Sequence, residues 1–243
     1  MSGLDSGSTV VEYWELSVAV PDADREDDRQ LLSTLERARA DRYRFDADRN
    51  LFVACRASLR RILGLRMDIP PSEVPVETDP LGKPFVADLD FHFNVTHSSG
   101  KGLIAVSQEP VGVDVEPLRL MSDASAVARR FFTSAEQTAI FRFGEQDQIS
   151  RRFLMCWTLK EALLKARGVG LSGSLTDFSV DIDRDPPKLT WEVEGASDTG
   201  SDATDKADKA WTLAFLPVED DYIGAVAVNA SSVQLRPHRD VDR

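Results

Sequence analysis

The stretch FHFNVTHSSGKGLIAVSQEPVGVDVE, residues 91–116, contains three short runs with the composition of β-strands. Each run is rich in β-branched and aromatic residues, and polar or glycine-containing segments separate the runs. The second and third runs are joined by a tight connection through Glu109 and Pro110. We therefore expect a small sheet formed by FHFNV (91–95), GLIAVS (102–107) and VGVDVE (111–116).

The segments before and after this sheet have the spacing of amphipathic helices. Apolar residues recur at every third or fourth position, which places them on one face of a helix. Gly64 is expected to end the helix before the sheet, and Gly168 with Gly170 to end the longest helix after it. Ser134 and Gln137 have the spacing of a capping box. The predicted helices are residues 31–40, 47–63, 121–131, 134–142 and 147–167.

Further strand patterns occupy the start and the last third of the chain. The predicted strands are residues 10–20, 178–182, 188–194, 211–217 and 222–228. The polar residues 195–210 are expected to form a mobile hairpin loop within this meander, and the tail after Ala230 is expected to be unstructured. Each half of the chain thus runs from helices to strands, which indicates two similar α+β units packed together.

The composition excludes several classes of protein. The chain has 243 residues with 41 acidic and 29 basic side chains, a formal net charge of −12. A surface this acidic does not favour binding of nucleic acid or of an anionic membrane, because phosphate binding needs a basic footprint. There is no apolar run long enough to span a bilayer and no secretory signal. Two distant cysteines, Cys55 and Cys156, predict a reducing cytoplasm and not a disulfide framework.

The run GVDVE, residues 112–116, carries two acidic residues on alternate positions of a predicted strand. Asp114 and Glu116 therefore point to one face, while Val113 and Val115 point to the core. Carboxylates held this close repel, and a hard divalent cation such as Mg²⁺ is the usual reason to keep them together. A half-buried strand with a hydrated face would show the same spacing, so both interpretations stay open from this run alone.

The predicted long helix contains WTLKEALLK, residues 157–165. Trp157, Glu161 and Lys165 follow one another at intervals of four, and Lys160 lies one step round the same face. Glu161 and Lys165 could form only a helix-stabilising pair. Because Trp157 marks this face as partly buried, we expect instead a third carboxylate for the cation, flanked by lysines that bind phosphates.

Two turns could bind an anion. FNVTHSSG, residues 93–100, leads from a strand into hydroxyl groups, an imidazole and backbone N–H groups that can hold phosphate oxygens. GKPF, residues 82–85, presents Lys83 on a turn set by Gly82 and Pro84. Each turn taken alone could equally be a solvated polar turn.

Taken in order, these four motifs resemble one family. GKP, FNVTHS, GVDVE and WTLKEALLK follow one another as in the 4′-phosphopantetheinyl transferases of the larger surfactin-synthetase-activator (Sfp) type. The resemblance extends from Leu31 to Val228. It implies the Mg²⁺-dependent transfer of phosphopantetheine from coenzyme A to a serine of an apo acyl or peptidyl carrier protein, with release of adenosine 3′,5′-bisphosphate.

The resemblance also implies an architecture. Enzymes of this type are monomers with two similar α+β halves, related by a pseudo-twofold axis, and their active site lies in the cleft between the halves. We accordingly expect an N-terminal half over residues 1–116, a C-terminal half over 117–230 and a flexible tail over 231–243.

The resemblance assigns candidate site residues by motif. It implies a cation, Mg²⁺ or Mn²⁺, bound by Asp114, Glu116 and Glu161, with Glu161 also the base for the carrier serine, directly or through water. It implies coenzyme A contacts, in particular Lys160 and Lys165 on the pyrophosphate and Arg39 or Arg42 on the 3′-phosphate. The full predicted set is catalytic Glu161, Lys165 and Asp114, and coenzyme A-binding Arg39, Lys83, Pro84, Thr96, His97, Lys160 and Lys165.

A carrier protein should dock next to this cleft. Carrier domains are generally acidic around their serine, so the resemblance implies a basic and apolar surface on the transferase. The candidates are Arg129, Arg130 and Phe131, with Phe132, Arg151 and Arg152 beside them. A solvated helix face with core phenylalanines is the alternative interpretation of the same residues.

Two other functions are compatible with parts of this sequence. An Asp followed later by Glu and Lys can also assemble a metal-dependent nuclease or phosphodiesterase site. The acidic composition and the ordered GKP and FNVTHS motifs speak against it. A non-catalytic coenzyme A or nucleotide-binding module is the other alternative, and the presence of all three carboxylates with both lysines speaks against that.

Overall fold

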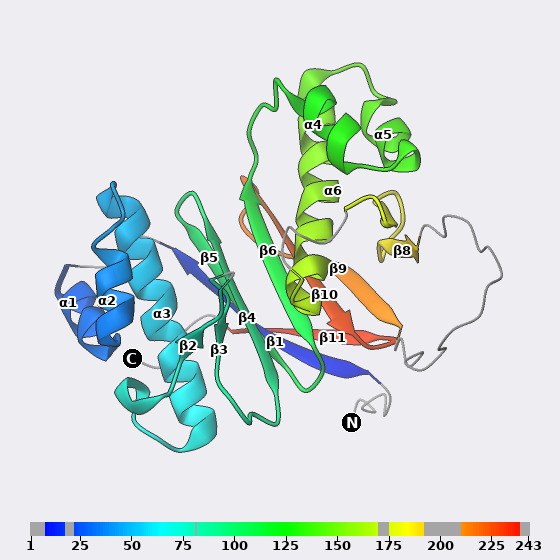
Figure 1. Ribbon diagram of the computed structural model, residues 1–243. Coiled ribbons are helices and arrows are strands. Elements are labelled where there is room, and N and C mark those ends of the chain that lie inside the picture. Colours follow the sequence, from blue (N-terminus) through cyan, green and yellow to red (C-terminus); the bar gives the residue numbers. More distant parts are fainter. Residues whose placement is uncertain (1–7, 18–21, 81, 170–174, 192–209, 239–243) are drawn as a thin grey trace.

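The computed structural model describes residues 8–17, 22–80, 82–169, 175–191 and 210–238 (Figure 1). Helices and strands are mixed, as predicted for an α+β protein. In these ranges no helix is long and apolar enough to cross a lipid bilayer. The helices are α1 (Asp22–Leu31), α2 (Thr34–Ala40), α3 (Asp46–Met67), α4 (Ala124–Phe131), α5 (Ser134–Phe141) and α6 (Gln146–Arg167). The strands are β1 (Thr9–Ser17), β2 (Glu77–Thr78), β3 (Pro84–Phe85), β4 (His92–Ser98), β5 (Lys101–Ser107), β6 (Val111–Pro117), β7 (Phe178–Asp181), β8 (Lys188–Trp191), β9 (Trp211–Leu216), β10 (Tyr222–Asn229) and β11 (Val233–His238).

The strands form sheets that differ from the predicted central sheet. One sheet has the order β11-β1-β5-β4 and another the order β6-β10-β9. The prediction that β4, β5 and β6 share a sheet is therefore wrong for β6, which pairs with β10 across Val113 and Val226. The tight connection at Pro110 leads the chain from one sheet to the other. The Pro110 carbonyl accepts a hydrogen bond from the Asn229 N–H of β10.

The alternation of side chains along β5 and β10 sets the order of the layers. On β5, Leu103 and Ala105 pack between the sheets, whereas Ile104 and Val106 pack against α3. The strand β10 follows the same rule, with Val226 and Val228 between the sheets and Ala225 and Ala227 against α6. The fold is therefore layered as helix, sheet, sheet, helix, with α3 and α6 on the outside (Figure 1).

The C-terminal strand β11 corrects the prediction of a flexible tail. Its residues pair in parallel with β1, from Val233 opposite Thr9 to His238 opposite Trp14. The His238 ring also stacks on Trp14 at 4.5 Å between ring centroids. Without β11, the β1 edge would expose unpaired N–H and C=O groups, which is a reason for the chain to return there. Residues 239–243 lie outside the described ranges.

The N-terminal helices extend beyond their predicted limits. The first one, α1, was not predicted, because DADREDDRQL lacks an apolar stripe, and the expected helix 31–40 is the end of α1 followed by α2. Gly64 does not end α3, which continues to Met67 and ends at Asp68 in the left-handed conformation. Gly64 is required for another reason, because a Cβ there would lie 2.8 Å from the Ile69 carbonyl oxygen.

The second half follows its predicted helices more closely. Gly168, with φ of 70°, ends α6 as expected, whereas Gly170 lies outside the described residues. The predicted capping box of Ser134 and Gln137 is wrong by one residue, since Thr133 and Glu136 form it. The predicted continuous meander is also wrong, because β7 and β8 pair separately from β9 and β10. Of the predicted loop at residues 195–210, only Ala210 lies in the described ranges.

The two helical pairs, α2–α3 and α5–α6, have closely similar bounds at an offset of 100 residues. The long helices begin at residues 46 and 146 and contain 22 residues each, and capping boxes precede α2 and α5 at Ser33 and Thr133. The predicted boundary after residue 116 falls at the end of β6, although β6 is hydrogen-bonded to the strands of the second half and β11 to those of the first. The relation of the halves by a two-fold axis stays a prediction.

Candidate active site

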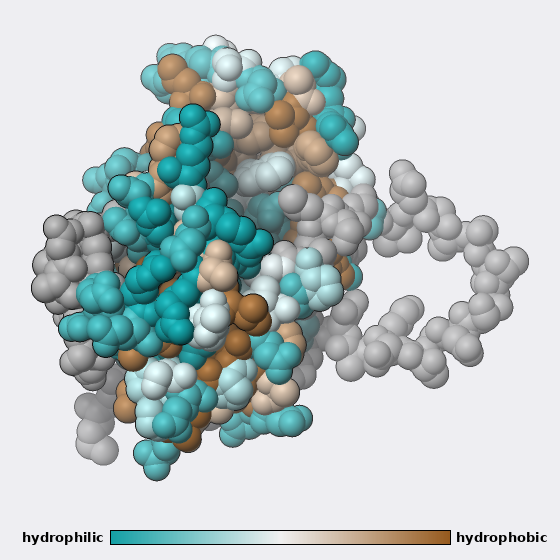
Figure 2. Space-filling model, turned by 60° about the vertical axis from the view of Figure 1, so that its left-hand side comes forward, coloured by the Kyte–Doolittle hydropathy of each residue, from teal (hydrophilic) through white to brown (hydrophobic). Residues whose placement is uncertain are grey.

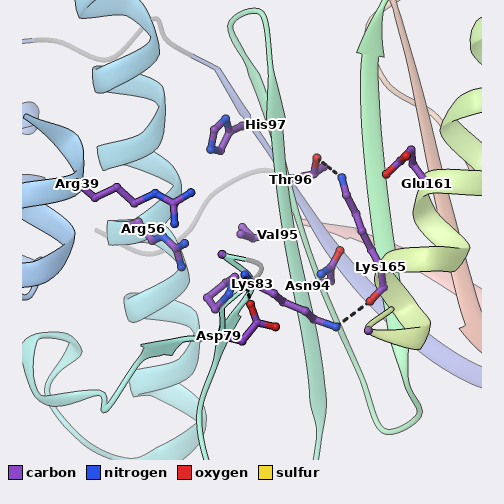
Figure 3. Close-up of a pocket in the computed structure, with 13 residues that line it drawn as sticks. Arg39, Arg56, Asp79, Lys83, Asn94, Val95, Thr96, His97, Glu161 and Lys165 are labelled. Carbon is purple, nitrogen blue, oxygen red and sulfur yellow. Dashed lines mark hydrogen bonds between the residues drawn. The ribbon is translucent and has the colours of Figure 1, made fainter. Parts of the chain in front are cut away.

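A cavity of about 450 Å³ lies between the helical pairs, where β4 and the C-terminal half of α6 approach each other (Figure 3). It brings together most of the predicted site residues, including Glu161 and Lys165 from α6 and Thr96 and His97 from β4. Its lining residues are Arg39, Arg56, Asp79, Gly82, Lys83, Pro84, Asn94, Val95, Thr96, His97, Glu161, Lys165 and Gly168.

The close contact of β6 with α6 brings Asp114 beside this cavity, against two of its lining residues, Thr96 and Lys165. The predicted ligands Asp114 and Glu116 are not themselves among the lining residues. A Cβ on Gly112 would lie 2.2 Å from the Ala162 carbonyl oxygen, so glycine allows the strand to lie directly on the helix. Asp114 is 4% exposed, and its Oδ1 accepts hydrogen bonds from Lys165 Nζ at 2.6 Å and from Thr96 Oγ1 at 3.2 Å. Three elements therefore meet at one carboxylate oxygen.

The predicted carboxylates have oxygens without partners. Among the described residues, Asp114 Oδ2 and Glu161 Oε1 are buried and accept no hydrogen bond. Burial, and then the charge of Asp114, raise the pKa of Glu161 to about 7, and the same two causes raise the pKa of Glu116. Glu116 also pairs with Arg119 at 3.1 Å. Negative charge is therefore concentrated here at an energetic cost, which a bound cation would relieve.

These carboxylates do not form a closed metal shell. Over the described ranges, no three histidine, cysteine or acidic side chains are close enough together to bind a metal ion as they stand. Mg²⁺ is usually bound by one or two carboxylates together with waters and substrate phosphates, so it does not require such a shell. The two carboxylate oxygens without partners, on Asp114 and Glu161, fit a cation of this kind.

The opposite wall of the cavity carries cations, one of which was not predicted from the sequence. Arg56 of α3 is 4% exposed, and its Nη1 has no hydrogen-bond partner in the described part of the chain. Arg39 and Arg56 both lie over the Phe52 ring, at 5.4 and 5.3 Å from its centroid. A buried guanidinium without a partner favours an anionic ligand. The available signal was that Arg56 follows Phe52 by four residues within the apolar stripe of its helix.

His97 lies near these cations. Burial, and then the positive charges of Arg56, Lys165 and Arg39, lower the pKa of His97 to about 4. The imidazole is therefore neutral near pH 7 in the absence of an anion. Arg42 is exposed and is not among the residues that line the cavity, so the structure favours Arg39 over Arg42 as the arginine of this wall.

Lys160 is not a cavity residue, and the prediction that it binds pyrophosphate is corrected. Its side chain is fully buried, with Nζ 2.7 Å from Glu136 Oε1. The same Nζ donates to the carbonyl oxygens of Leu175 and Phe178, at 2.6 and 2.5 Å. Because consecutive helix residues point about 100° apart, Lys160 faces the core of the second half while Glu161 faces the cavity.

Lys83 lines the cavity with Pro84, as predicted for the GKP turn. Its Nζ donates to the carbonyl oxygen of Lys165 at 2.7 Å, and its N–H donates to Asp79 Oδ1 at 2.8 Å. Burial lowers the pKa of Lys83. The ammonium thus contacts the main chain of α6 in the absence of a ligand.

The predicted carrier surface is divided between solvent and core. Arg129 and Arg130 are exposed and Phe131 is half-buried, whereas Phe132 is 2% exposed and belongs to the core. Arg152 is occupied by an ion pair with Asp183 at 2.7 Å, and Arg151 is exposed. The exposed part of the predicted surface therefore consists of Arg129, Arg130, Arg151 and the edge of Phe131. Figure 2 shows the side of the molecule that carries the N-terminal helices, where mainly hydrophilic residues lie.

Comparison with known proteins identifies the family of this chain. A family model described as the 4′-phosphopantetheinyl transferase superfamily matches residues 110–227. The 4′-phosphopantetheinyl transferase HetI of Nostoc sp. is 33% identical over 226 residues, which cover 91% of this chain and 88% of HetI. A phosphopantetheinyl transferase of Thraustochytrium sp. is 29% identical over 90% of this chain and 78% of its own length. The 4′-phosphopantetheinyl transferase Sfp of Bacillus subtilis is 31% identical over 52% of this chain and 56% of its own length. Similarity at this level over almost the whole length shows that the chain belongs to the 4′-phosphopantetheinyl transferase superfamily.

Proposed function

We propose that this protein transfers 4′-phosphopantetheine from coenzyme A to a serine of an apo carrier protein. One observation carries the proposal. A single cavity joins Arg56, whose buried Nη1 has no hydrogen-bond partner among the described residues, to Glu161, whose buried Oε1 also has none there. Coenzyme A has the matching chemistry, since its 3′-phosphate and pyrophosphate are separate anionic groups. The family membership supports the same substrate.

The cations of the cavity would bind the phosphates. Arg39 and Arg56 with His97 form one group, suited to the 3′-phosphate, because guanidinium groups and an imidazole can donate together to one phosphate. Lys165 and Thr96 form the other group beside Asp114, suited to the pyrophosphate. Of the two arginines considered in the sequence, Arg39 has the supporting geometry.

Asp114, Glu116 and Glu161 would hold Mg²⁺, with Mn²⁺ as a possible substitute. When bound, such a cation neutralises negative charge on the pyrophosphate and so favours departure of the leaving phosphate. Asp114 and Glu161 each keep a buried oxygen that no hydrogen bond of the described residues satisfies. Glu116 would exchange its ion pair with Arg119 for this role.

The remaining groups would position the serine and accept its proton. The serine Oγ–phosphorus bond forms as the phosphorus–oxygen bond of the pyrophosphate breaks, and adenosine 3′,5′-bisphosphate leaves. The proton of the serine passes to Glu161, directly or through a water. A carboxylate bound to a cation is a weak base, which favours the route through a water. Lys165 would stabilise the charge that develops on the transferred phosphate.

The carrier protein would dock on the exposed end of α4. Arg129 and Arg130 are exposed there, and the Arg130 guanidinium lies 5.0 Å from the centroid of the Phe131 ring, so cationic and apolar groups are adjacent. Arg129→Glu with Arg130→Glu should raise the KM for the carrier protein and leave the affinity for coenzyme A unchanged. An unchanged carrier KM would exclude this surface. A monomer acting in the reducing cytoplasm remains the expectation, and Cys55 and Cys156 are buried without a disulfide.

The test is direct. Purified protein is incubated with Mg²⁺, coenzyme A and several apo carrier proteins, and the intact mass of each carrier is measured. We expect the added mass of phosphopantetheine, its loss when Mg²⁺ is chelated, and its absence with Asp114→Ala at unchanged melting temperature. If no carrier gains this mass, the proposal fails. Calorimetric binding of coenzyme A without transfer would then favour a binding module, and cleavage of a phosphodiester probe would favour a nuclease.

A further inference from the structure

Lys83 connects the two halves of the protein at the floor of the cavity. It belongs to the turn that precedes β3, and its Nζ donates to the carbonyl oxygen of Lys165, 82 residues later, at 2.7 Å (Figure 3). The side chain is half-buried between these segments. This hydrogen bond joins the turn before β3 to the end of α6.

The turn that carries Lys83 is held by its own hydrogen bonds. The Asp79 N–H donates to the Lys83 carbonyl at 3.0 Å, and the Lys83 N–H donates to Asp79 Oδ1 at 2.8 Å. The Gly82 N–H donates in addition to the Asp79 carbonyl at 2.9 Å. These bonds fix the conformation of the turn from which the ammonium extends.

The acceptor lies in the last turn of α6, where helix carbonyls lack partners within the helix. The Gly168 N–H lies 3.3 Å from the Lys165 carbonyl oxygen, so Lys83 at 2.7 Å is the closer donor. A cation at a helix C-terminus also interacts favourably with the helix dipole. Lys83 thus stabilises the end of a helix that belongs to the other half.

The side chain of Lys165 is also hydrogen-bonded to segments outside α6. Lys165 Nζ donates to Asp114 Oδ1 and Thr96 Oγ1, so its carbonyl and its ammonium are both bound to segments outside α6. Glu161 lies one turn before Lys165 on this helix. A shift of the helix end would therefore move the side chains of Glu161 and Lys165 relative to Asp114.

We propose that Lys83 is a positioning residue, whose ammonium caps the C-terminus of α6 across the cleft and so places Glu161 and Lys165 for the reaction. This role deepens the proposed function and rests on it for its effect on transfer. It differs from the role of a phosphate ligand expected for the GKP turn. A phosphate ligand acts mainly on coenzyme A affinity, whereas a positioning residue acts mainly on turnover.

The experiment compares Lys83→Met, Lys83→Arg and the control Lys188→Met, which removes one exposed lysine of β8. Hydrogen exchange of the amides from Leu163 to Val169 is measured without coenzyme A, coenzyme A affinity by calorimetry, and kcat by transfer to a carrier protein. Melting temperatures establish that each variant is folded.

For Lys83→Met we expect faster exchange at the end of α6, a fall in kcat of about tenfold or more, and a coenzyme A Kd changed by no more than about threefold. Lys83→Arg should restore the exchange and most of the turnover, and Lys188→Met should match the wild type. Unchanged exchange with a coenzyme A Kd raised about tenfold would overturn the proposal and identify a phosphate ligand. If the wild type transfers nothing, the proposed function fails, while the exchange measurement still tests the cap.

Discussion

In the helical pair α2–α3 and in the pair α5–α6, a cation buried in the long helix is bonded to the capping-box glutamate of the short helix. In the first pair, Arg60 Nη2 lies 2.7 Å from Glu36 Oε2, and Ser33 completes the capping box. The Arg60 guanidinium also donates to the carbonyl oxygens of Pro71 and Val74. One buried arginine thus joins a helix start, a second helix and the following turn.

The second pair repeats this arrangement 100 residues later. Lys160 Nζ lies 2.7 Å from Glu136 Oε1, and Thr133 completes the capping box. The ammonium also donates to the carbonyl oxygens of Leu175 and Phe178. The comparison indicates that the lysine of WTLKE is the counterpart of Arg60 and has a structural role.

The two pairs differ where they face the cavity. Arg39 and Arg56 of the first pair stand where the second pair has Ala139 and Cys156. Glu161 and Lys165 of the second pair stand where the first has Arg61 and Leu65. The shared positions therefore build the scaffold, and the positions that differ supply anion-binding groups from one half and the acid and lysine from the other.

The largest expected effect tests the shared scaffold. Lys160→Met should lower the free energy of unfolding by about 3–5 kcal/mol, because it leaves Glu136 buried without its cation. Urea unfolding measures this loss, and Arg60→Met in the first pair should be comparable. Lys188→Met, which removes an exposed lysine of β8, is the control and should change stability little. If Lys160→Met kept its stability and instead lost coenzyme A affinity, the comparison between the two cations would be wrong.

The next largest expected effect tests the positions at which the two helical pairs differ. Glu161→Gln should lower kcat for transfer by about 10³-fold at nearly unchanged stability, because it removes the charge and the proton acceptor. The matching variant in the first half, Arg61→Gln, removes an ion pair with Asp28 of 2.7 Å and should change stability without changing kcat. Single-turnover assays of both variants make the measurement. A transfer rate of Glu161→Gln close to that of the wild type contradicts the assignment.

A smaller effect concerns the pKa of His97, which faces the two arginines that only the first half supplies. Arg39 and Arg56, with Lys165 from α6, face His97, and Asp48 opposes them weakly. Because the folded-state pKa of His97 is about 4, below the ordinary 6.5, the unfolded chain binds the extra proton first. The neutral imidazole therefore contributes stability that is present above pH 6.5 and is lost as the pH falls toward 4.

This loss should amount to about 1–3 kcal/mol. Urea unfolding at several pH values compares the wild type with His97→Asn, and the difference between the two should change between pH 6.5 and 4. His92→Asn, at an exposed position of the same strand, controls for the general effect of acid. If the wild type and His97→Asn lose stability in parallel, His97 is not held neutral by its neighbours.

The smallest effect compares the two capping boxes. Ser33→Ala and Thr133→Ala should each cost about 1 kcal/mol, because the first turn loses a hydrogen-bond acceptor. Thr133→Ala should cost more, since Thr133 Oγ1 also lies 2.6 Å from Ser179 Oγ. Urea unfolding of both variants decides the order. Equal losses would mean that the contact with Ser179 adds nothing to the cap.

Local periodicity predicted the parts of the site that lie on one element. The alternation of a strand placed Asp114 and Glu116 on one face, and the helical interval of four grouped Glu161 with Lys165. It did not determine the direction of Lys160, because Trp157 marked a partly buried face without saying which element covers it. Arg56 was not predicted for the same reason, since its anionic partner would come from outside its helix.

The sequence by itself determined the helices other than α1, most strands, the order of the motifs and the family they resemble. These depend on contacts within a few residues, where the spacing of side chains is set by the backbone. Only the tertiary structure decided that β6 leaves its neighbours for β10, that β11 returns to β1, and that Lys83 reaches Lys165. Each of these is a choice among distant partners of similar local chemistry, and packing and hydrogen-bond satisfaction across the whole chain make that choice.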